Sequence, residues 1–499
     1  MSASISVTTL KDSFSLLSPD FLLHHGACPR EVKEDGTIVL AVESNGYYSE
    51  VIEELRAAGL EQLTIEEVTR SELEQLIVRI ALQVTDGAED GSASIDGDQR
   101  DSQTTDVRDL AKEPPVIRYL NLLIREAVDA NASDIHLESL RGGLQARFRI
   151  DGVLTEAPAA PNHLAAGVIS RTKLLAELDI AEARRPQDGR IRVRLESRDL
   201  DIRVSTVPSQ VGESVVLRLL DHGGRPVELQ QLGMPESILE DALRIITRPH
   251  GMLLVTGPTG SGKTSTLYAA LQKRSVKKEK IITVEDPVEY QLHGVTQVPV
   301  HRQAGMTFPT ALRSILRQDP DVLMIGEMRD HETAEIAVQA ALTGHFVFST
   351  LHTTDALGAI PRLLDLGIPD YLLVAVLDAV IAQRLVRRVC DSCKVPYTPD
   401  PIFGAALRKL WRREDMEGVA LVHGIGCEAC HWTGYRGRTG VFEILNVSDE
   451  IRDAIIGRAS RVELRGIAAR HGSRSLIDDA WDKVKAGITT MEEVVRVIQ

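Results

Sequence analysis

The sequence predicts a multidomain α/β protein whose central domain is a mostly parallel sheet with helices on both faces. Three observations support this prediction. With 499 residues, the chain is long enough for about three domains. From about residue 223 onward, apolar strand patterns alternate with helical patterns, as expected where helices connect parallel strands. Within this region, a glycine-rich loop stands between a strand pattern and a helix pattern at residues 252–272.

The chain before this core divides into three predicted parts. Residues 1–85 form a small α/β domain, because the strand pattern TIVLAVES is followed by helical patterns. Residues 86–113 form a flexible acidic linker, since a segment rich in Asp, Gly and Ser cannot bury enough apolar surface to fold. Residues 114–222 form an α+β domain, in which the helical pattern VIRYLNLLIREAVDA precedes the strand patterns LQARFRIDGVL, DLDIRVSTVPS and SVVLRLL.

The core is expected at residues 223–385, a cysteine-bearing subdomain at 386–441 and a helical region at 442–499. The most apolar run, YLLVAVLDAVIAQ at 371–383, is too short for a membrane span and contains Asp378, so it predicts a buried helix. The first residues lack the basic region and apolar core of a signal peptide. These patterns predict a cytoplasmic protein that reaches a membrane only through a partner.

The charge balance argues against nucleic acid as the main partner. The chain has 57 basic and 72 acidic residues, and its net charge is −15. Proteins that bind nucleic acid as their main partner usually carry a basic surface. The composition therefore argues against a nucleic-acid translocase or helicase, although such enzymes use similar cores.

The glycine-rich loop GPTGSGKT matches the phosphate-binding pattern G-x-x-x-x-G-K-[ST]. In such a loop, backbone N–H groups turn toward phosphate oxygens, and the following helix adds its positive dipole. Lys263 is expected to contact the β- and γ-phosphates of ATP, and Thr264 to bind Mg²⁺. The loop residues expected to hold the nucleotide are Gly257, Pro258, Thr259, Gly260, Ser261, Gly262, Lys263, Thr264 and Ser265.

Two other strand patterns end in acidic residues that could converge on the same Mg·ATP. ITVEDPVEY, at 282–290, supplies Glu285 and Asp286, and DVLMIGEMRD, at 321–330, supplies Glu327. Glu327 is expected to orient or deprotonate the attacking water, because its long side chain can reach past the metal. Its alternative role is that of a helix-start acid or an ion-pair partner. Glu285 is the second catalytic candidate, and the choice of general base between the two glutamates stays open.

A further strand pattern, TGHFVFSTLHTTDA at 343–356, is bracketed by His345 and His352. A histidine at the end of a strand can sense the γ-phosphate by hydrogen bonding. We expect His352 to contact the nucleotide. For His345, a core histidine with satisfied hydrogen bonds is an equal alternative.

Four of the five cysteines form two C-x₂-C pairs, CDSC at 390–393 and CEAC at 427–430. Two such knuckles complete a tetrahedral Zn²⁺ site, in which four thiolates leave no open position for water. The ligands of one structural zinc ion are therefore expected to be Cys390, Cys393, Cys427 and Cys430. Disulfides are disfavoured because the chain has no export signal. Cys28 stands alone and predicts an ordinary buried thiol.

These motifs together resemble those of the secretion and pilus ATPase superfamily. GPTGSGKT resembles its Walker A motif, TVEDPVEY its Asp box and TGHFVFSTLHTTDA its His box. RQDPDVLMIGEMRD resembles its atypical Walker B motif, in which glutamate is the usual residue and is taken as catalytic. ASDIHLES and RFRIDGVL resemble the domain that precedes the core in that superfamily. Chain length and the tetracysteine motif are most similar to the type II secretion ATPases, with type IV pilus extension ATPases as the alternative.

The resemblance implies a RecA-like core, a PAS-like domain before it and a homo-hexameric ring, in which the pre-core domain of one subunit faces the nucleotide of another. It also implies arginine contacts to that nucleotide, at Arg203 and Arg218 of the pre-core domain and at Arg313 and Arg317 of the core. For each arginine, a surface salt bridge is the alternative.

The resemblance further implies the partners and place of work of a protein-exporting ATPase motor. Its N-terminal domain would dock on the cytoplasmic domain of a GspL-like inner-membrane secretion protein, and the motor would act on a GspF-like membrane platform protein to assemble a pseudopilus. The protein would then lie peripherally on the cytoplasmic face of the inner membrane. The remaining alternative is a nucleotide-binding scaffold without hydrolysis, against which the intact Lys263, Thr264, Glu285 and Glu327 argue.

Overall fold

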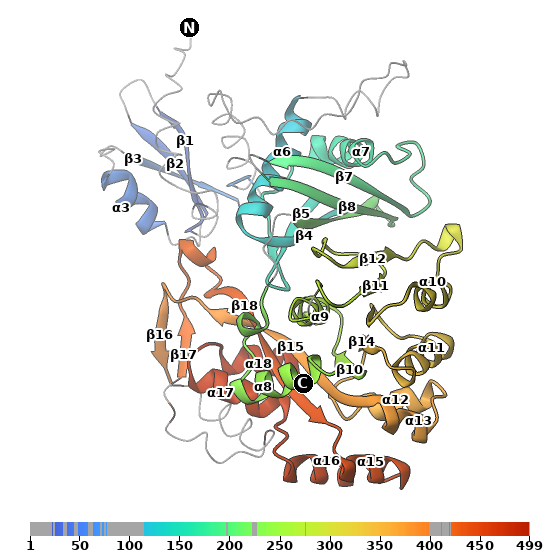
Figure 1. Ribbon diagram of the computed structural model, residues 1–499. Helices are drawn as coiled ribbons and strands as arrows, with labels where there is room; N and C mark the ends of the chain where they lie inside the picture. Colours follow the sequence, from blue (N-terminus) through green and yellow to red (C-terminus); the bar gives the residue numbers. More distant parts are fainter. Residues whose placement is uncertain are drawn as a thin grey trace. The chain divides into compact units, whose positions relative to one another are not determined.

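A computed structural model describes most of the chain (Figure 1). The described ranges are 25–32, 37–43, 48–57, 63–69, 114–195, 198–221, 227–274, 276–398 and 421–498, with the single positions 22, 72, 73, 76, 411 and 419. The chain divides into two compact units, Met1–Gly224 and Arg225–Gln499. The predicted linker at 86–113 lies outside the described residues. In the described part of the chain, no helix combines the length and apolar character that a membrane span requires.

The N-terminal sheet has the order β1-β2-β3. β1 (Ala27–Val32) and β2 (Ile38–Glu43) are antiparallel, whereas β2 and β3 (Leu63–Val68) are parallel and are joined through α3 (Ser49–Ala57). The buried face of α3 carries Val51 and Leu55. This mixture of strands and a helix confirms a small α/β fold near the N-terminus, in which Cys28 is buried as expected.

A second sheet in the same unit is antiparallel and has the order β6-β5-β4-β9-β8-β7. Its strands are β4 (Ala132–Leu140), β5 (Gly143–Ile150), β6 (Val153–Glu156), β7 (Gln187–Leu195), β8 (Arg198–Pro208) and β9 (Glu213–Asp221). The helices α6 (Pro114–Asp129) and α7 (Ala165–Leu175) share one apolar core with the sheet. Because strand residues alternate between faces, the other face is left to polar side chains.

The large sheet of the second unit has the order β12-β11-β13-β14-β10-β15-β18, and every neighbouring pair is parallel except β15 with β18. Its strands are β10 (Gly251–Thr256), β11 (Ile281–Glu285), β12 (Thr296–Pro299), β13 (Val322–Ile325), β14 (Phe346–Leu351), β15 (Leu377–Val389) and β18 (Tyr435–Asn446). The predicted mostly parallel sheet is therefore confirmed.

Two apolar cores cover the two faces of this sheet. Along β10, for example, Met252 and Leu254 belong to one core, and Leu253 and Val255 to the other. α8 (Glu236–Ile246) and α9 (Lys263–Leu271) pack in the second core. The first core contains α10 (Phe308–Ile315), α11 (His331–Leu342), α12 (Ala359–Asp365) and α13 (Asp370–Val376). Helices thus pack against both faces, as the sequence predicts.

The run 371–383 is not one buried helix, so that prediction was wrong. It begins in α13 and continues from Leu377 as β15, which pairs with β10 on one side and β18 on the other. The sheet needs a strand between β10 and β18, and its hydrogen bonds override the local helical spacing. Asp378 is half-buried, and it accepts a close hydrogen bond from Arg248.

The C-terminal part is helical as expected, but the helices begin later than residue 442 because β18 extends to Asn446. They are α15 (Asp449–Ile456), α16 (Arg461–Arg470), α17 (Leu476–Lys485) and α18 (Met491–Ile498). A small hairpin of β16 (Lys394–Tyr397) and β17 (Leu421–Gly424) stands next to the cysteine pairs. A buried ion pair between Arg387 of β15 and Glu493 of α18 fixes the last helix to the sheet.

Candidate active site

The glycine-rich loop connects β10 to α9 at the carboxyl edge of the parallel strands. Gly257, Gly260 and Gly262 have φ values of 153°, 78° and 85°, in the range that favours glycine. A Cβ atom at Gly257 would lie 2.5 Å from the carbonyl oxygen of Gln383. This position must therefore lack a side chain, because the loop passes close to β15 there. These constraints leave the loop's backbone N–H groups and the first turn of α9 at the same edge.

Lys263 is the first residue of α9, and its ammonium group folds back over the loop. It donates hydrogen bonds to the carbonyl oxygens of Gly257 (2.8 Å) and Pro258 (3.0 Å). Burial lowers the pKa of Lys263 to about 8, an effect that the negative charge of Glu327 opposes and the nearby Arg384 reinforces. An anion bound in the loop would restore the charged form, which suits Lys263 to phosphate. Thr264 and Ser265 follow in the first turn of α9, half-buried.

Glu327 follows β13, and His352 follows β14, which lies between β13 and β10 in the sheet. One oxygen of Glu327 is 2.7 Å from Nε of Arg329 and 3.4 Å from Nε2 of His352. The Glu327 side chain is only 14% exposed, whereas the His352 side chain is 43% exposed. The fold therefore gathers Lys263, Glu327 and His352 at one edge. Arg329 joins them, and sequence reasoning missed it although it stands two residues after Glu327.

Glu285 lies at the end of β11, and its carboxyl group is buried among hydrogen-bond donors. It accepts from the hydroxyls of Tyr268 and Thr283 (2.5 Å for Thr283) and from the amide of Gln297 (3.1 Å). Burial raises the pKa of Glu285, and these hydrogen bonds oppose the rise. Glu285 and Glu327 thus occupy different surroundings: Glu285 is linked to α9 through Tyr268, whereas Glu327 is linked to His352. Asp286, the next residue, is 3.0 Å from Arg302.

His345 lies at the opposite end of β14 from His352. Its Nδ1 is 2.8 Å from the carbonyl oxygen of Ala340 at the end of α11, and 3.1 Å from the hydroxyl of Thr343. The six residues of β14 separate the two histidines. At about 3.3 Å per strand residue, His345 is on the order of 20 Å from the carboxyl edge. Within this unit, His345 therefore closes the turn before β14, at the edge opposite to Lys263, Glu327 and His352.

The two predicted core arginines lie on α10 and the turn after it. Arg313 is 2.5 Å from Glu332 at the start of α11. Arg317 donates to the carbonyl oxygen of Arg313 (2.7 Å) and to the hydroxyl of Ser314 (3.4 Å). The Arg313 side chain is 54% exposed, so its guanidinium group is accessible to another molecule.

The two predicted arginines of the first unit belong to a row of charged residues across its six-stranded sheet. Cross-strand pairing aligns Arg149, Asp134, Arg218, Arg203 and Arg190, on β5, β4, β9, β8 and β7 in that order. Arg218 donates to Asp134 at 2.9 Å, and its side chain is 62% exposed. We call these five residues the arginine row. Sequence reasoning missed Arg149 and Arg190, because only the strand register shows that they share this line.

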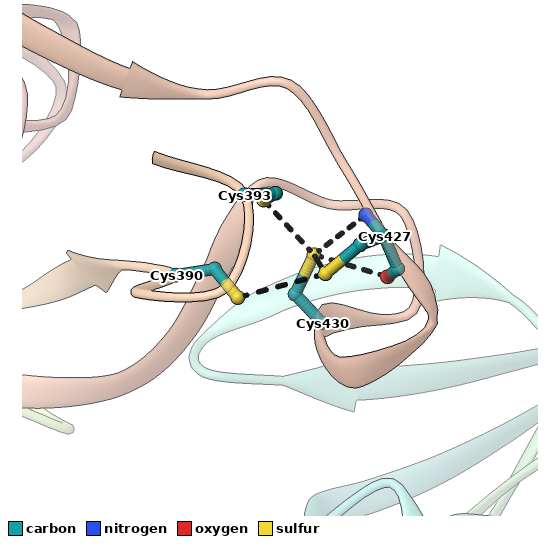
Figure 2. Close-up of side chains that lie close together, drawn as sticks. All are labelled: Cys390, Cys393, Cys427 and Cys430. Carbon is teal, nitrogen blue, oxygen red and sulfur yellow. Dashed lines mark hydrogen bonds between the residues drawn. The ribbon is translucent and has the colours of Figure 1, made fainter. Parts of the chain in front are cut away.

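The four cysteines of the two knuckles come together beside the β16–β17 hairpin. Figure 2 shows their side chains pointing toward one another. Their sulfur atoms all lie within 4.8 Å of one another, with separations of 3.8 Å for Cys390 and Cys427, 3.9 Å for Cys393 and Cys430, and 3.7 Å for Cys427 and Cys430. A tetrahedral zinc site with Zn–S bonds of about 2.3 Å requires sulfur atoms about 3.8 Å apart. The arrangement fits zinc, and the separations are too long for disulfides.

Comparisons with known proteins agree on one family. The family model described as "Type II/IV secretion system protein" matches residues 109–496. The chain is 45% identical to the type II secretion system protein E of Xanthomonas campestris pv. campestris, over 97% of this chain and 85% of that protein. It is 48% identical to the type II secretion system ATPase E of Vibrio cholerae serotype O1, over 79% of this chain and 78% of that protein.

Two solved structures share the fold. The Legionella pneumophila ATPase DotB is 21% identical, with a TM-score of 0.55, over 76% of this chain and 94% of that chain. The pilus retraction motor PilT, solved with bound ADP, is 27% identical, with a TM-score of 0.50, over 76% of this chain and 96% of that chain. These similarities agree with the predicted resemblance to secretion and pilus ATPases.

The different surroundings of Glu327 and Glu285 generate a prediction about hydrolysis. Glu327→Gln should retain ATP binding and lower kcat by about 100-fold or more, because an amide of the same shape cannot accept the proton of the attacking water. Nucleotide binding and single-turnover hydrolysis on the same preparation would measure both effects.

Two variants complete that experiment. Lys263→Ala should lose productive ATP binding itself, so it separates a binding defect from a chemical one. The assignment is reversed if Glu285→Gln binds ATP without turnover while Glu327→Gln turns over normally.

Proposed function

Because this chain belongs to the type II/IV secretion system protein family, we propose that it is the ATPase that powers protein export by a type II secretion system. Its relatives of 45% and 48% identity carry that system's name, and they cover most of this chain. The observation that carries the proposal is the meeting of Glu327 and His352 at 3.4 Å, at the edge where Lys263 begins α9. The chain is an ATP-hydrolysing enzyme, and export is the work that we assign to it.

The proposed reaction is the attack of water on the γ-phosphate of ATP, which releases ADP and phosphate. Glu327 accepts the proton of the attacking water, and His352 holds the Glu327 carboxylate and senses the γ-phosphate. Lys263 neutralises the charge that develops on the β- and γ-phosphates. Thr264 holds the Mg²⁺, which supplies further charge neutralisation when it is bound. Glu285 keeps α9 in place through Tyr268, and Asp286 contacts the nucleotide region.

We also propose that the protein acts as a homo-hexamer. A phosphate loop that is open to solvent hydrolyses ATP slowly, because water screens the charge that forms in the transition state. Arg203 and Arg218 of one subunit, and Arg313 and Arg317, would supply the missing cations to a nucleotide held by another subunit. The arginine row supports this role, since cross-strand pairing brings four arginines into one line with a single acidic residue, Asp134.

The N-terminal domain is proposed to dock on a membrane partner. Residues 1–85 would bind the cytoplasmic domain of a GspL-like inner-membrane protein, and the ring would act on a GspF-like platform protein to assemble a pseudopilus. The enzyme would then work on the cytoplasmic face of the inner membrane.

One structural zinc ion is proposed for each chain, bound by the four gathered thiolates. Backbone hydrogen bonds already hold the knuckles in shape: Cys390 donates to Gly434 (3.0 Å), and Ile425 donates to Cys393 (3.1 Å). With all four sulfur atoms bound, the ion has no open position, so its role is to stabilise this lobe rather than to catalyse.

The export function predicts a phenotype in the native host. When Glu327→Gln replaces the chromosomal copy, proteins that leave by the type II pathway should accumulate inside the cell envelope, because the motor binds ATP but cannot cycle. Fractionation of the secreted proteins would measure this. Normal export combined with loss of surface pili would instead identify a pilus extension motor.

The zinc proposal predicts one equivalent of metal in the purified chain. Elemental analysis should find about one zinc per chain, and Cys430→Ser should lose it and lower the unfolding temperature of this lobe, while ATP still binds at Lys263. Cys28→Ser is the matched control, because Cys28 is a buried cysteine outside the cluster. Reduced thiols without zinc in a fully folded preparation would contradict the proposal.

The ring proposal predicts rescue between two inactive variants. Subunits with Lys263→Ala lack a working phosphate loop, and subunits with Arg218→Gln lack a cation that we assign to a neighbour's nucleotide. In mixed rings, some interfaces combine an intact loop with an intact arginine, so part of the ATPase activity should return.

The control mixture pairs Lys263→Ala with Glu327→Gln. Both changes lie in the core, so no intact site can form in those rings and activity should stay low. If the first mixture also stays inactive while mixed rings demonstrably form, then Arg218 acts within its own subunit or only on structure.

A further inference from the structure

The loop at residues 352–356 touches the proposed catalytic glutamate at one end and a C-terminal helix at the other. His352, at its start, lies 3.4 Å from Glu327. Asp355, three residues later, bonds to two arginines of α16. We call residues 352–356 the histidine loop. α16 lies more than a hundred residues further along the chain, so only the fold brings it to this loop.

The histidine loop is also fixed to the strand that carries the phosphate loop. The backbone N–H of Thr353 donates to the hydroxyl of Thr256 at the end of β10 (2.9 Å), and the two hydroxyls are 2.7 Å apart. Arg384 of β15 donates to the carbonyl oxygen of Thr354 (2.6 Å). The first half of the loop therefore has a defined position relative to Lys263 and its neighbours.

Asp355 fixes the second half of the loop. One of its oxygens accepts from the N–H of Gly358 (2.9 Å), and the other accepts from Arg465 (3.1 Å) and, more closely, from Arg461. The Asp355 side chain is 15% exposed, so two guanidinium groups compensate a largely buried charge.

A second carboxyl group, that of Glu443, lies beneath the same loop. Its negative charge would repel Asp355, so Asp355 depends on the two arginines to stay in place. Glu443 of β18 accepts from the N–H of Ala356 and from the N–H of Leu476, both at 3.3 Å. Burial and, to a smaller extent, the nearby charge of Asp355 together raise the pKa of Glu443 to about 7. Without Arg461 and Arg465, two acidic groups would face each other beneath the loop with less positive charge around them.

We propose that Asp355, held by Arg461 and Arg465, is a positioning residue for ATP hydrolysis. These contacts fix the histidine loop so that His352 stays against Glu327, and Glu327 stays aimed at the attacking water. The inference rests on the proposed role of Glu327. A displacement of about 1 Å in such a group lowers the rate of a reaction strongly while it leaves the binding of the rest of the substrate unchanged.

If Arg461 and Arg465 only stabilised the fold, their removal would lower kcat and the unfolding temperature together. The positioning role predicts a lower kcat without that loss of stability. Arg461 and Arg465 are 53% and 66% exposed although Asp355 is only 15% exposed, so water screens the arginine side of each pair and we expect each pair to contribute only about 1 kcal/mol to stability. Removing them should therefore leave the folded chain intact. An effect on kcat without an effect on the unfolding temperature would distinguish positioning from stabilisation.

The experiment compares full-length protein with the double variant Arg461→Gln/Arg465→Gln. We expect kcat for ATP to fall by about tenfold, KM to change by less than about twofold, and the unfolding temperature to stay within about 2 °C. Arg470→Gln is the matched control, because Arg470 lies on the same helix, is 63% exposed and bonds to Glu450 instead. The control should match the unchanged protein.

A variant of Asp355 tests whether Arg461 and Arg465 affect kcat through this residue. Asp355→Asn keeps an acceptor for Gly358 but removes the charge, and it should lower kcat like the double variant. If the arginines act through Asp355, combining all three changes should give no further loss.

Three outcomes would overturn the inference: unchanged kcat in the double variant, losses that multiply when the changes are combined, or a fall in kcat that parallels a fall in unfolding temperature. These outcomes can be distinguished from a failure of the proposed role of Glu327 in hydrolysis. The Glu327→Gln experiment tests the role of Glu327 separately, and it does not involve α16.

Discussion

Alternate residues of β10, β13 and β14 enter two separate apolar cores, so both faces of the large sheet are mostly apolar. The polar side chains that these strands contribute to the site therefore lie where the strands end. Thr256, Glu327 and His352 all follow or close such strands, and the phosphate loop begins at the same edge. The chemistry of this chain depends on that constraint. It brings polar groups from three sequence segments that are far apart in the chain to the same edge of the sheet.

The same edge is stabilised by contacts from β15, which lies outside the phosphate loop. β15 crosses below the phosphate loop and contributes Gln383 and Arg384, which bond to Thr266 and to the histidine loop. Arg387, on the same strand, is bonded to the buried carboxylate of Glu493 in α18. Because β15 leads directly into Cys390, one strand links the phosphate loop, the cysteine lobe and the last helix. Movement at the nucleotide thus has a continuous bonded path to the C-terminal part of the unit.

Residues 371–383 show where tertiary pairing outweighs a local sequence pattern. Residues 371–383 have helical spacing and no glycine or proline, but the edge of β10 offers unpaired backbone groups that only a strand can satisfy. The sequence places one histidine on each side of β14, and it leaves the role of His345 open. In a parallel sheet the two ends of a strand are at opposite edges, and the direction of β14 alone separates His352, next to Glu327, from His345, which bonds to the end of α11.

The sequence by itself determined the phosphate loop, the acidic strand ends, the cysteine spacing and the alternation of strand and helix, because each depends on residues that are close along the chain. It could not determine which charged residues meet across strands or across elements. Arg149 and Arg190 join Arg203 and Arg218 only through strand register, and Asp355 meets Arg461 and Arg465 only because α16 packs near the end of β14. Such contacts join segments that are far apart in the chain, and their position is set by which apolar surfaces pack together, so only the tertiary structure decided them.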